Sequence, residues 1–202
     1  MTFTGLVGKI CMFPLSALIR ISVRLRIHPN VLTFIGVVIN VAAAWALALG
    51  RFVIAGVIMV VANIFDFIDG KVARERGMES AFGGFWDSVM DRVSDLALFL
   101  GLVYLYSRLG RTDYVLITAL AMTFTVLTSY ARARAESVVE KCKVGFMERP
   151  ERIVLFMIGA FTNRMAGVLW VILVLSVLTV ADRIYFTYRE LGRAKAREGI
   201  AV

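Results

Sequence analysis

Four aspartates lie close together in the stretch Asp66–Asp91, beside hydrophobic sequence. Asp66 and Asp69 are three residues apart, so on a helix they share one face. Asp87 and Asp91 are four residues apart and form a second pair of the same kind. Carboxylate oxygens are the ligands that hard divalent cations prefer, and such cations bridge carboxylates to substrate phosphates. The spacing therefore predicts a pocket for one or two metal ions and a phosphate between two helices.

Small residues and one arginine accompany these carboxylates. Gly70 and Ala73 follow the first pair, and Gly83 precedes Asp87 by one helical turn. Positions without bulky side chains let a nucleotide approach the backbone. Arg74 adds a fixed positive charge that suits a pyrophosphate group.

The complete pattern, D-x2-D-G-x2-A-R-x8-G-x3-D-x3-D, resembles the signature of the CDP-alcohol phosphotransferases, integral membrane enzymes of phospholipid synthesis. The eight fixed positions agree in residue type and spacing: Asp66, Asp69, Gly70, Ala73, Arg74, Gly83, Asp87 and Asp91. A single D-x2-D pair would be a weak signal, whereas the whole set indicates the family strongly.

The resemblance implies roles for individual residues. Spacing alone does not choose which carboxylate is the general base, and the resemblance implies Asp91. The implied ligands of Mg²⁺, with Mn²⁺ as the substitute, are Asp66, Asp69, Asp87 and Asp91. The implied nucleotide-binding residues are Asn30, Thr33, Asp69, Gly70, Ala73, Arg74 and Gly83. For Asn30, capping of the following helix is the alternative role.

A second group of basic residues follows later in the chain. The segments A-R-A-E and E-R-P-E-R are similar to the branch of the family that uses inositol phosphate, the phosphatidylinositol-phosphate synthases and their archaeal counterparts. This resemblance implies that four arginines bind the phosphate of the acceptor: Arg132, Arg134, Arg152 and Arg183. By composition alone, positive charges that set membrane orientation beside anionic lipid are the better explanation.

The elements that must position these residues are predicted to be membrane helices. A hydrophobic content of 59% and a mean hydropathy of +0.79 exclude an ordinary soluble domain. The predicted spans are 31–49, 53–74, 81–106, 114–138, 151–163 and 165–189. The fifth is the weakest, because residues 153–162 provide only about half of the length of a bilayer. In the third, Asp95 continues the stripe of Asp91, with Arg92 as the favoured partner.

The predicted fold is an all-α membrane protein with six transmembrane helices preceded by an N-terminal amphipathic interfacial helix. We expect a single transmembrane domain over residues 1–202, with the interfacial helix in 1–28, the six-helix bundle in 29–190 and a tail in 191–202. The resemblance further implies a homodimer.

The net charge of +8 indicates the orientation of the chain in the membrane rather than binding to nucleic acid. Most of the 23 Lys and Arg residues fall in the segments that six spans would place on one side. By the positive-inside rule, both termini and the aspartates are predicted on the cytoplasmic side of the cell membrane. Membrane lipids and anionic substrates are therefore the expected partners.

The resemblance implies a transferase that moves a phosphatidyl-type group from a CDP-linked lipid, CDP-diacylglycerol or CDP-archaeol, to the hydroxyl of myo-inositol 1-phosphate, with release of CMP. Glycerol 3-phosphate and serine are the alternative acceptors. A divalent-cation transporter is the alternative from another class, but it would place acidic residues at mid-depth on several spans. A lipid-binding protein without catalysis would not need all eight signature residues.

Overall fold

The structure, a computed structural model, describes residues 18–197 and the side chains of residues 18–193. It contains the helices α2 (Pro29–Ala48), α3 (Phe52–Glu75), α4 (Ala81–Arg108), α5 (Thr112–Ala135), α6 (Arg149–Phe161) and α7 (Met165–Arg197). No strand occurs in the described range, so the predicted all-α class is confirmed. The predicted N-terminal amphipathic helix falls mostly on residues 1–17, which lie outside the described residues. Of the predicted segment the structure describes 18–28, in which 18–24 are helical.

Four helices are long and apolar enough to cross a membrane: α2, α3, α5 and α7. The chain is therefore a membrane protein. Helix α4 has 28 residues but carries several charges in its first half. Helix α6 has 13 residues, about 20 Å of rise, against about 30 Å for the hydrocarbon core of a bilayer. By length and composition the described residues thus provide four spans, and the prediction of six stays a prediction.

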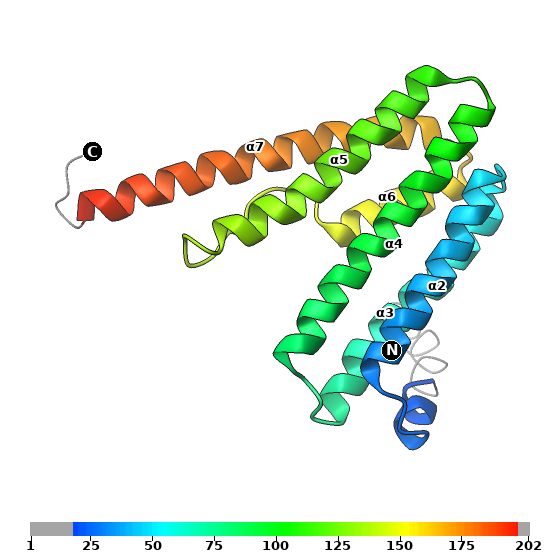
Figure 1. Cartoon of the computed structure of the whole chain (residues 1–202), viewed down its shortest axis with the longest axis horizontal. Coiled ribbons are helices and arrows are strands. Elements are labelled where there is room, and N and C mark those ends of the chain that lie inside the picture. Colours follow the sequence, from blue (N-terminus) through cyan, green and yellow to red (C-terminus); the bar gives the residue numbers. More distant parts are fainter. Residues whose placement is uncertain (1–17, 198–202) are drawn as a thin grey trace, which may run out of the picture.

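The helices form two groups that share α4. Helix α2 packs against α3 and α4, while α5 packs against α7, and the short α6 contacts α3 and α7. Figure 1 shows α4 and α5 meeting at one end and diverging toward the other. The core contains fully buried side chains such as Phe99 and Phe156, whose rings pack edge to face at 5.0 Å. A Cβ atom on Gly101 would lie 2.3 Å from the carbonyl oxygen of Ala44, so a glycine is required where α4 crosses α2.

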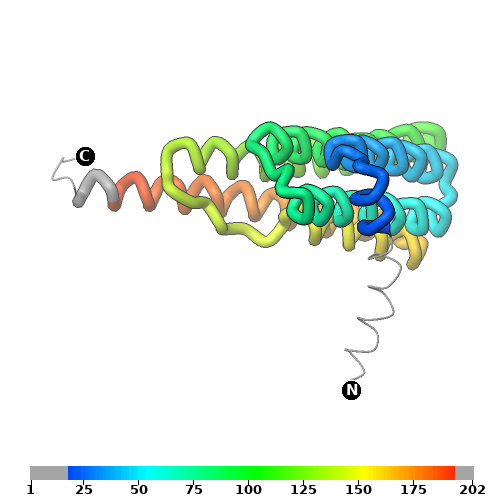
Figure 2. The backbone as a smooth tube through the Cα atoms, turned by 90° about the horizontal axis from the view of Figure 1, so that it is seen from below, coloured from blue at the N-terminus to red at the C-terminus, as the bar shows by residue number. Residues whose placement is uncertain are grey.

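Short connections bring three helix ends together. Gly77, with a φ of +61°, closes α3 in the left-handed conformation, and Ser80 then caps α4 by accepting a hydrogen bond of 3.0 Å from the Gly83 amide. The start of α2 lies beside them, as the view from below in Figure 2 shows. The cap of α2 is His28, whose Nδ1 accepts from the Asn30 amide at 3.2 Å. The predicted capping role of Asn30 is therefore wrong.

A break separates the fifth and the sixth predicted spans. Helix α6 ends at Phe161, and Asn163 adopts a positive φ of 56° before α7 begins at Met165. Helix α7 then continues to Arg197, beyond the predicted end of the last span.

Candidate active site

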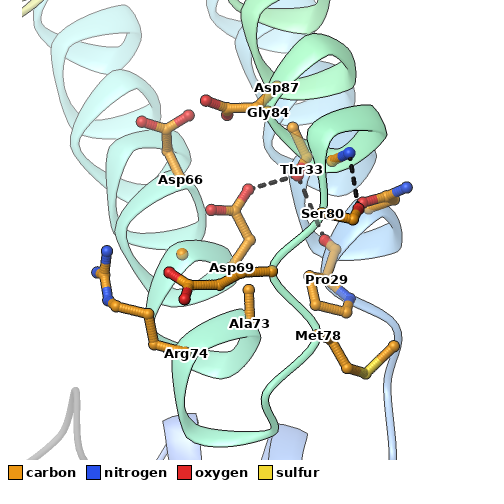
Figure 3. A pocket seen from close by; sticks show the side chains of 14 residues that line it. Pro29, Thr33, Asp66, Asp69, Ala73, Arg74, Met78, Ser80, Gly84 and Asp87 are labelled. Atoms are coloured by element: carbon orange, nitrogen blue, oxygen red, sulfur yellow. Dashed lines mark hydrogen bonds between the residues drawn. The ribbon is translucent and has the colours of Figure 1, made fainter.

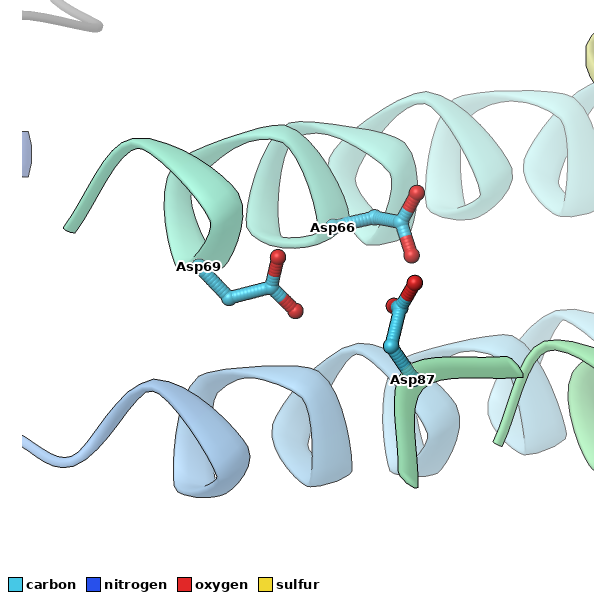
Figure 4. A group of neighbouring side chains, drawn as sticks. All are labelled: Asp66, Asp69 and Asp87. Atoms are coloured by element: carbon cyan, nitrogen blue, oxygen red, sulfur yellow. The ribbon is translucent and has the colours of Figure 1, made fainter. Parts of the chain in front are cut away.

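Three of the predicted carboxylates converge. Asp66 and Asp69 come from the last turns of α3, and Asp87 comes from α4 opposite them (Figure 4). One oxygen of each lies within 4.8 Å of the other two. We call these residues the carboxylate cluster. Negative charges at such distances repel one another unless a cation lies among them, and an all-oxygen donor set suits a hard divalent ion.

Helix α2 holds one member of the cluster in place. The hydroxyl of Thr33 donates a hydrogen bond to Oδ2 of Asp69, whose side chain is only 6% exposed (Figure 3). Thr33 therefore orients the carboxylate that lies deepest, which is a positioning task that the sequence pattern alone did not reveal.

A cavity of about 320 Å³ opens beside the cluster (Figure 3). All seven residues predicted to bind the nucleotide line it: Asn30, Thr33, Asp69, Gly70, Ala73, Arg74 and Gly83. The turn between α3 and α4 adds Met78, Glu79 and Ser80, which sequence reasoning missed. They fall in the unspecified eight-residue gap of the signature, and only the turn geometry brings them to the cavity.

Asp91 lies apart from the carboxylate cluster. Its Oδ1 is 3.0 Å from Nη1 of Arg149, and the same nitrogen donates to Oδ2 of Asp66 at 2.8 Å. Arg149, at the start of α6, thus connects the proposed base to the cluster. Arg149 was not among the predicted site residues. Its only signal was its place in the E-R-P-E-R segment.

Asp95 pairs with Arg152 of α6, not with Arg92. The favoured pairing within α4 is therefore wrong. Asp95 and Arg152 are both buried, whereas Arg92 donates to the backbone oxygen of Ser88 in its own helix. A buried carboxylate requires a buried cation for compensation, and only the neighbouring helix provides one.

The four predicted acceptor arginines divide into two sets. Arg132 of α5 and Arg183 of α7 converge, and both donate to Oε1 of Glu148, at 2.7 and 3.1 Å. We call Arg132 and Arg183 the arginine pair. Arg134 instead donates to Ser137 at 2.9 Å, and Arg152 is occupied by Asp95. The structure therefore brings two of the four together, around a carboxylate of the chain itself.

Comparison with known proteins places this arrangement in a family. Residues 26–181 match the CDP-alcohol phosphatidyltransferase family. The chain belongs to that family. The archaetidylinositol phosphate synthase of Pyrococcus horikoshii is 34% identical over 179 residues, which cover 88% of this chain and 93% of the relative.

Solved structures agree with this membership. The phosphatidylinositol phosphate synthase of Mycobacterium tuberculosis with CDP-DAG bound is 29% identical, with a TM-score of 0.80 over 86% of this chain and 93% of the other. A structure of the same enzyme in complex with manganese and citrate has a TM-score of 0.79 at 28% identity, over 86% of this chain and 88% of the other. This CDP-alcohol phosphatidyltransferase is therefore an enzyme, and membership decides against the transporter and the lipid-binding alternatives.

Proposed function

We propose that this CDP-alcohol phosphatidyltransferase moves a phosphatidyl-type group from a CDP-linked lipid to myo-inositol 1-phosphate and releases CMP. The observation that carries the proposal is the carboxylate cluster, three oxygens within 4.8 Å, at the wall of the 320 Å³ cavity. The names of the relatives support the choice of acceptor, since one is an archaetidylinositol phosphate synthase and another a phosphatidylinositol phosphate synthase.

In this proposal the cavity binds the nucleotide end of the donor lipid. Gly70, Ala73 and Gly83 leave room for it, and Arg74 pairs with its pyrophosphate. Asp66, Asp69 and Asp87 would hold Mg²⁺, or Mn²⁺ in its place, with Asp91 as a further ligand. A divalent cation there supplies neutralisation of the negative charge that develops on the departing CMP.

Asp91 is the proposed general base. It takes the proton from the acceptor hydroxyl as the new oxygen–phosphorus bond forms and the bond from phosphorus to the CMP oxygen breaks. Arg149 contacts Oδ1 of Asp91 and so orients the carboxylate, and in this proposal Oδ2 is the atom that takes the proton. The same arginine contacts Asp66, which keeps the base and the cluster in one rigid group.

The arginine pair is the proposed site for the phosphate of the acceptor. Two guanidinium groups that already converge on one carboxylate can converge on a phosphate in the same way. Glu148 would then leave this position when the acceptor binds. Arg134 and Arg152 are proposed as further contributors to the acceptor-phosphate site. Arg152 would contribute indirectly, because its pairing with Asp95 holds the start of α6 in place.

The proposed setting is a single six-span domain in the cytoplasmic membrane, with an interfacial N-terminal helix, and with both termini and the active site on the cytoplasmic side. The charged half of α4 and the short α6 would complete the six spans. Support comes from the one-sided distribution of Lys and Arg. A homodimer is proposed from the family resemblance.

The decisive assay combines purified protein, Mg²⁺, a CDP-linked lipid and one acceptor at a time, and measures CMP. Inositol 1-phosphate is expected to release CMP far faster than glycerol 3-phosphate or serine, with CDP-diacylglycerol and CDP-archaeol compared as donors. CMP release with glycerol 3-phosphate alone would overturn the proposed acceptor and keep the reaction class. No release with any acceptor would overturn the proposed reaction.

A further inference from the structure

A second, much smaller cavity lies behind the Asp91–Arg149 pair. Its volume is about 10 Å³, which is close to the space that one water molecule needs. Its polar walls come from α2, α3, α4 and α6: Thr33, Asn40, Asp66, Asp91, Ser94 and Arg149. The cavity is separate from the 320 Å³ cavity, the nucleotide cavity of the proposed function, but shares Thr33 and Asp66 with it.

Asn40 is the most informative of these residues. Its side chain is 3% exposed, and its Oδ1 has no hydrogen-bond partner among the described residues. Buried amide oxygens in folded proteins are nearly always hydrogen-bonded, to protein or to ordered water. Asn40 also shares a face of α2 with Thr33, seven residues earlier, which already holds Asp69.

Ser94 completes the polar wall opposite. It is 2% exposed and follows Asp91 by three residues, so both point to the same side of α4. An amide, a hydroxyl, a carboxylate and a guanidinium around one water-sized space provide the two to four partners that a buried water requires.

We propose that Asn40 and Ser94 bind one water molecule that links them to the Asp91–Arg149 pair. The two residues are positioning residues, because the water restrains the base and its arginine and does not touch the substrate. The inference rests on the proposed function in one respect, the role of Asp91 as base. Neither Asn40 nor Ser94 belongs to the eight fixed positions of the family signature.

The kinetic test uses Asn40→Leu, Ser94→Ala and the double variant. Each single variant is expected to lower kcat for CMP release about tenfold. Losses of this size are found when a group that hydrogen-bonds to a metal ligand is removed. The KM values for the CDP-lipid and for inositol 1-phosphate should stay within about twofold, because neither residue lines the nucleotide cavity. The double variant should lose no more than either single variant, since both act through the same water.

Thr125→Val is the matched control. Thr125, on α5, is buried, and its Oγ1 also lacks a partner among the described residues, but it lines neither cavity. Its replacement should leave kcat unchanged. If Asn40→Leu does not fold, Ser94→Ala decides the kinetic question, because it removes a single oxygen. Unchanged kcat in Ser94→Ala, or losses that multiply in the double variant, would overturn the proposal.

The structural readout does not depend on the acceptor. A high-resolution structure of the wild-type protein should show one water within hydrogen-bond distance of Asn40 and Ser94, and Asn40→Leu should displace it. A cavity without density would overturn the inference even if the enzyme is active. Failure of the proposed function is distinguishable, because the wild-type protein would then release no CMP with inositol 1-phosphate although the water is present.

Discussion

The carboxylate cluster and the arginine pair are built in opposite ways. The cluster comes from two helices that are neighbours in the chain, joined by the short turn at Gly77, and its acids face one another. The arginine pair comes from α5 and α7 and encloses Glu148, an acid of the connection between α5 and α6. One region thus has three carboxylates against the single arginine Arg149, an excess of negative charge that suits a cation. In the other region, the two arginines are already compensated by Glu148 and Glu136. The carboxylate cluster can therefore bind a cation without losing a partner, whereas the arginine pair must release Glu148 before it can bind a phosphate.

The largest expected effect is in the cluster. Asp69→Asn keeps the shape and the contact with Thr33 but removes one negative charge, so CMP release should fall about 10²–10³-fold. The measurement is CMP release at saturating Mg²⁺. Asp113→Asn is the control, because this exposed aspartate pairs with Arg111 before the start of α5, away from the cluster. Activity within a few-fold of wild type in Asp69→Asn would contradict the cation site.

Arg152→Ala tests whether this arginine belongs to the structure or to the acceptor site. It removes the nearer of the two arginines that pair with the buried Asp95 and leaves only Arg149, at 3.9 Å, which is expected to destabilise the protein by about 3 kcal/mol. The measurement is thermal unfolding in detergent, and the double variant Asp95→Leu/Arg152→Met should recover most of the loss. A normal unfolding temperature with a raised KM for inositol 1-phosphate would instead assign Arg152 directly to the acceptor.

Arg132→Ala tests the arginine pair. It should raise the KM for inositol 1-phosphate about tenfold, because one charge-assisted hydrogen bond to the phosphate is lost. The KM for the CDP-lipid should stay unchanged. Arg134→Ala removes a further proposed contributor that contacts Ser137 outside the pair, so it should raise the same KM by less than Arg132→Ala does. If both variants changed the two KM values equally, the arginines would provide only a general positive field.

The smallest expected effect comes from Glu148→Gln. Without its charge, the side chain competes less with a phosphate for Arg132 and Arg183, so the KM for inositol 1-phosphate should fall about three- to fivefold. The assay is acceptor titration at constant ionic strength. A rise in this KM would show that Glu148 positions the arginines rather than competing with the acceptor.

The local pattern of the sequence determined the helices and the cluster. Alternating apolar runs predicted the helices from α2 to α6 to within a few residues, because each run is a property of its own segment. The spacings of Asp66 to Asp69 and of Gly83 to Asp87 placed these residues on helix faces by the period of 3.6 residues per turn. The sequence also predicted a pocket between the two helices, since they are consecutive and their ends must meet.

Only the tertiary structure decided which charges are partners. Arg149 contacts Asp66 from 83 residues away, and Arg152 contacts Asp95 from 57 residues away. No local period carries such information, because it depends on how α6 packs beside α3 and α4. Sequence spacing therefore favoured Arg92 for Asp95, whereas burial selected Arg152. The sequence by itself determined where the carboxylates lie along the helices, and packing determined which of them are left free for a cation.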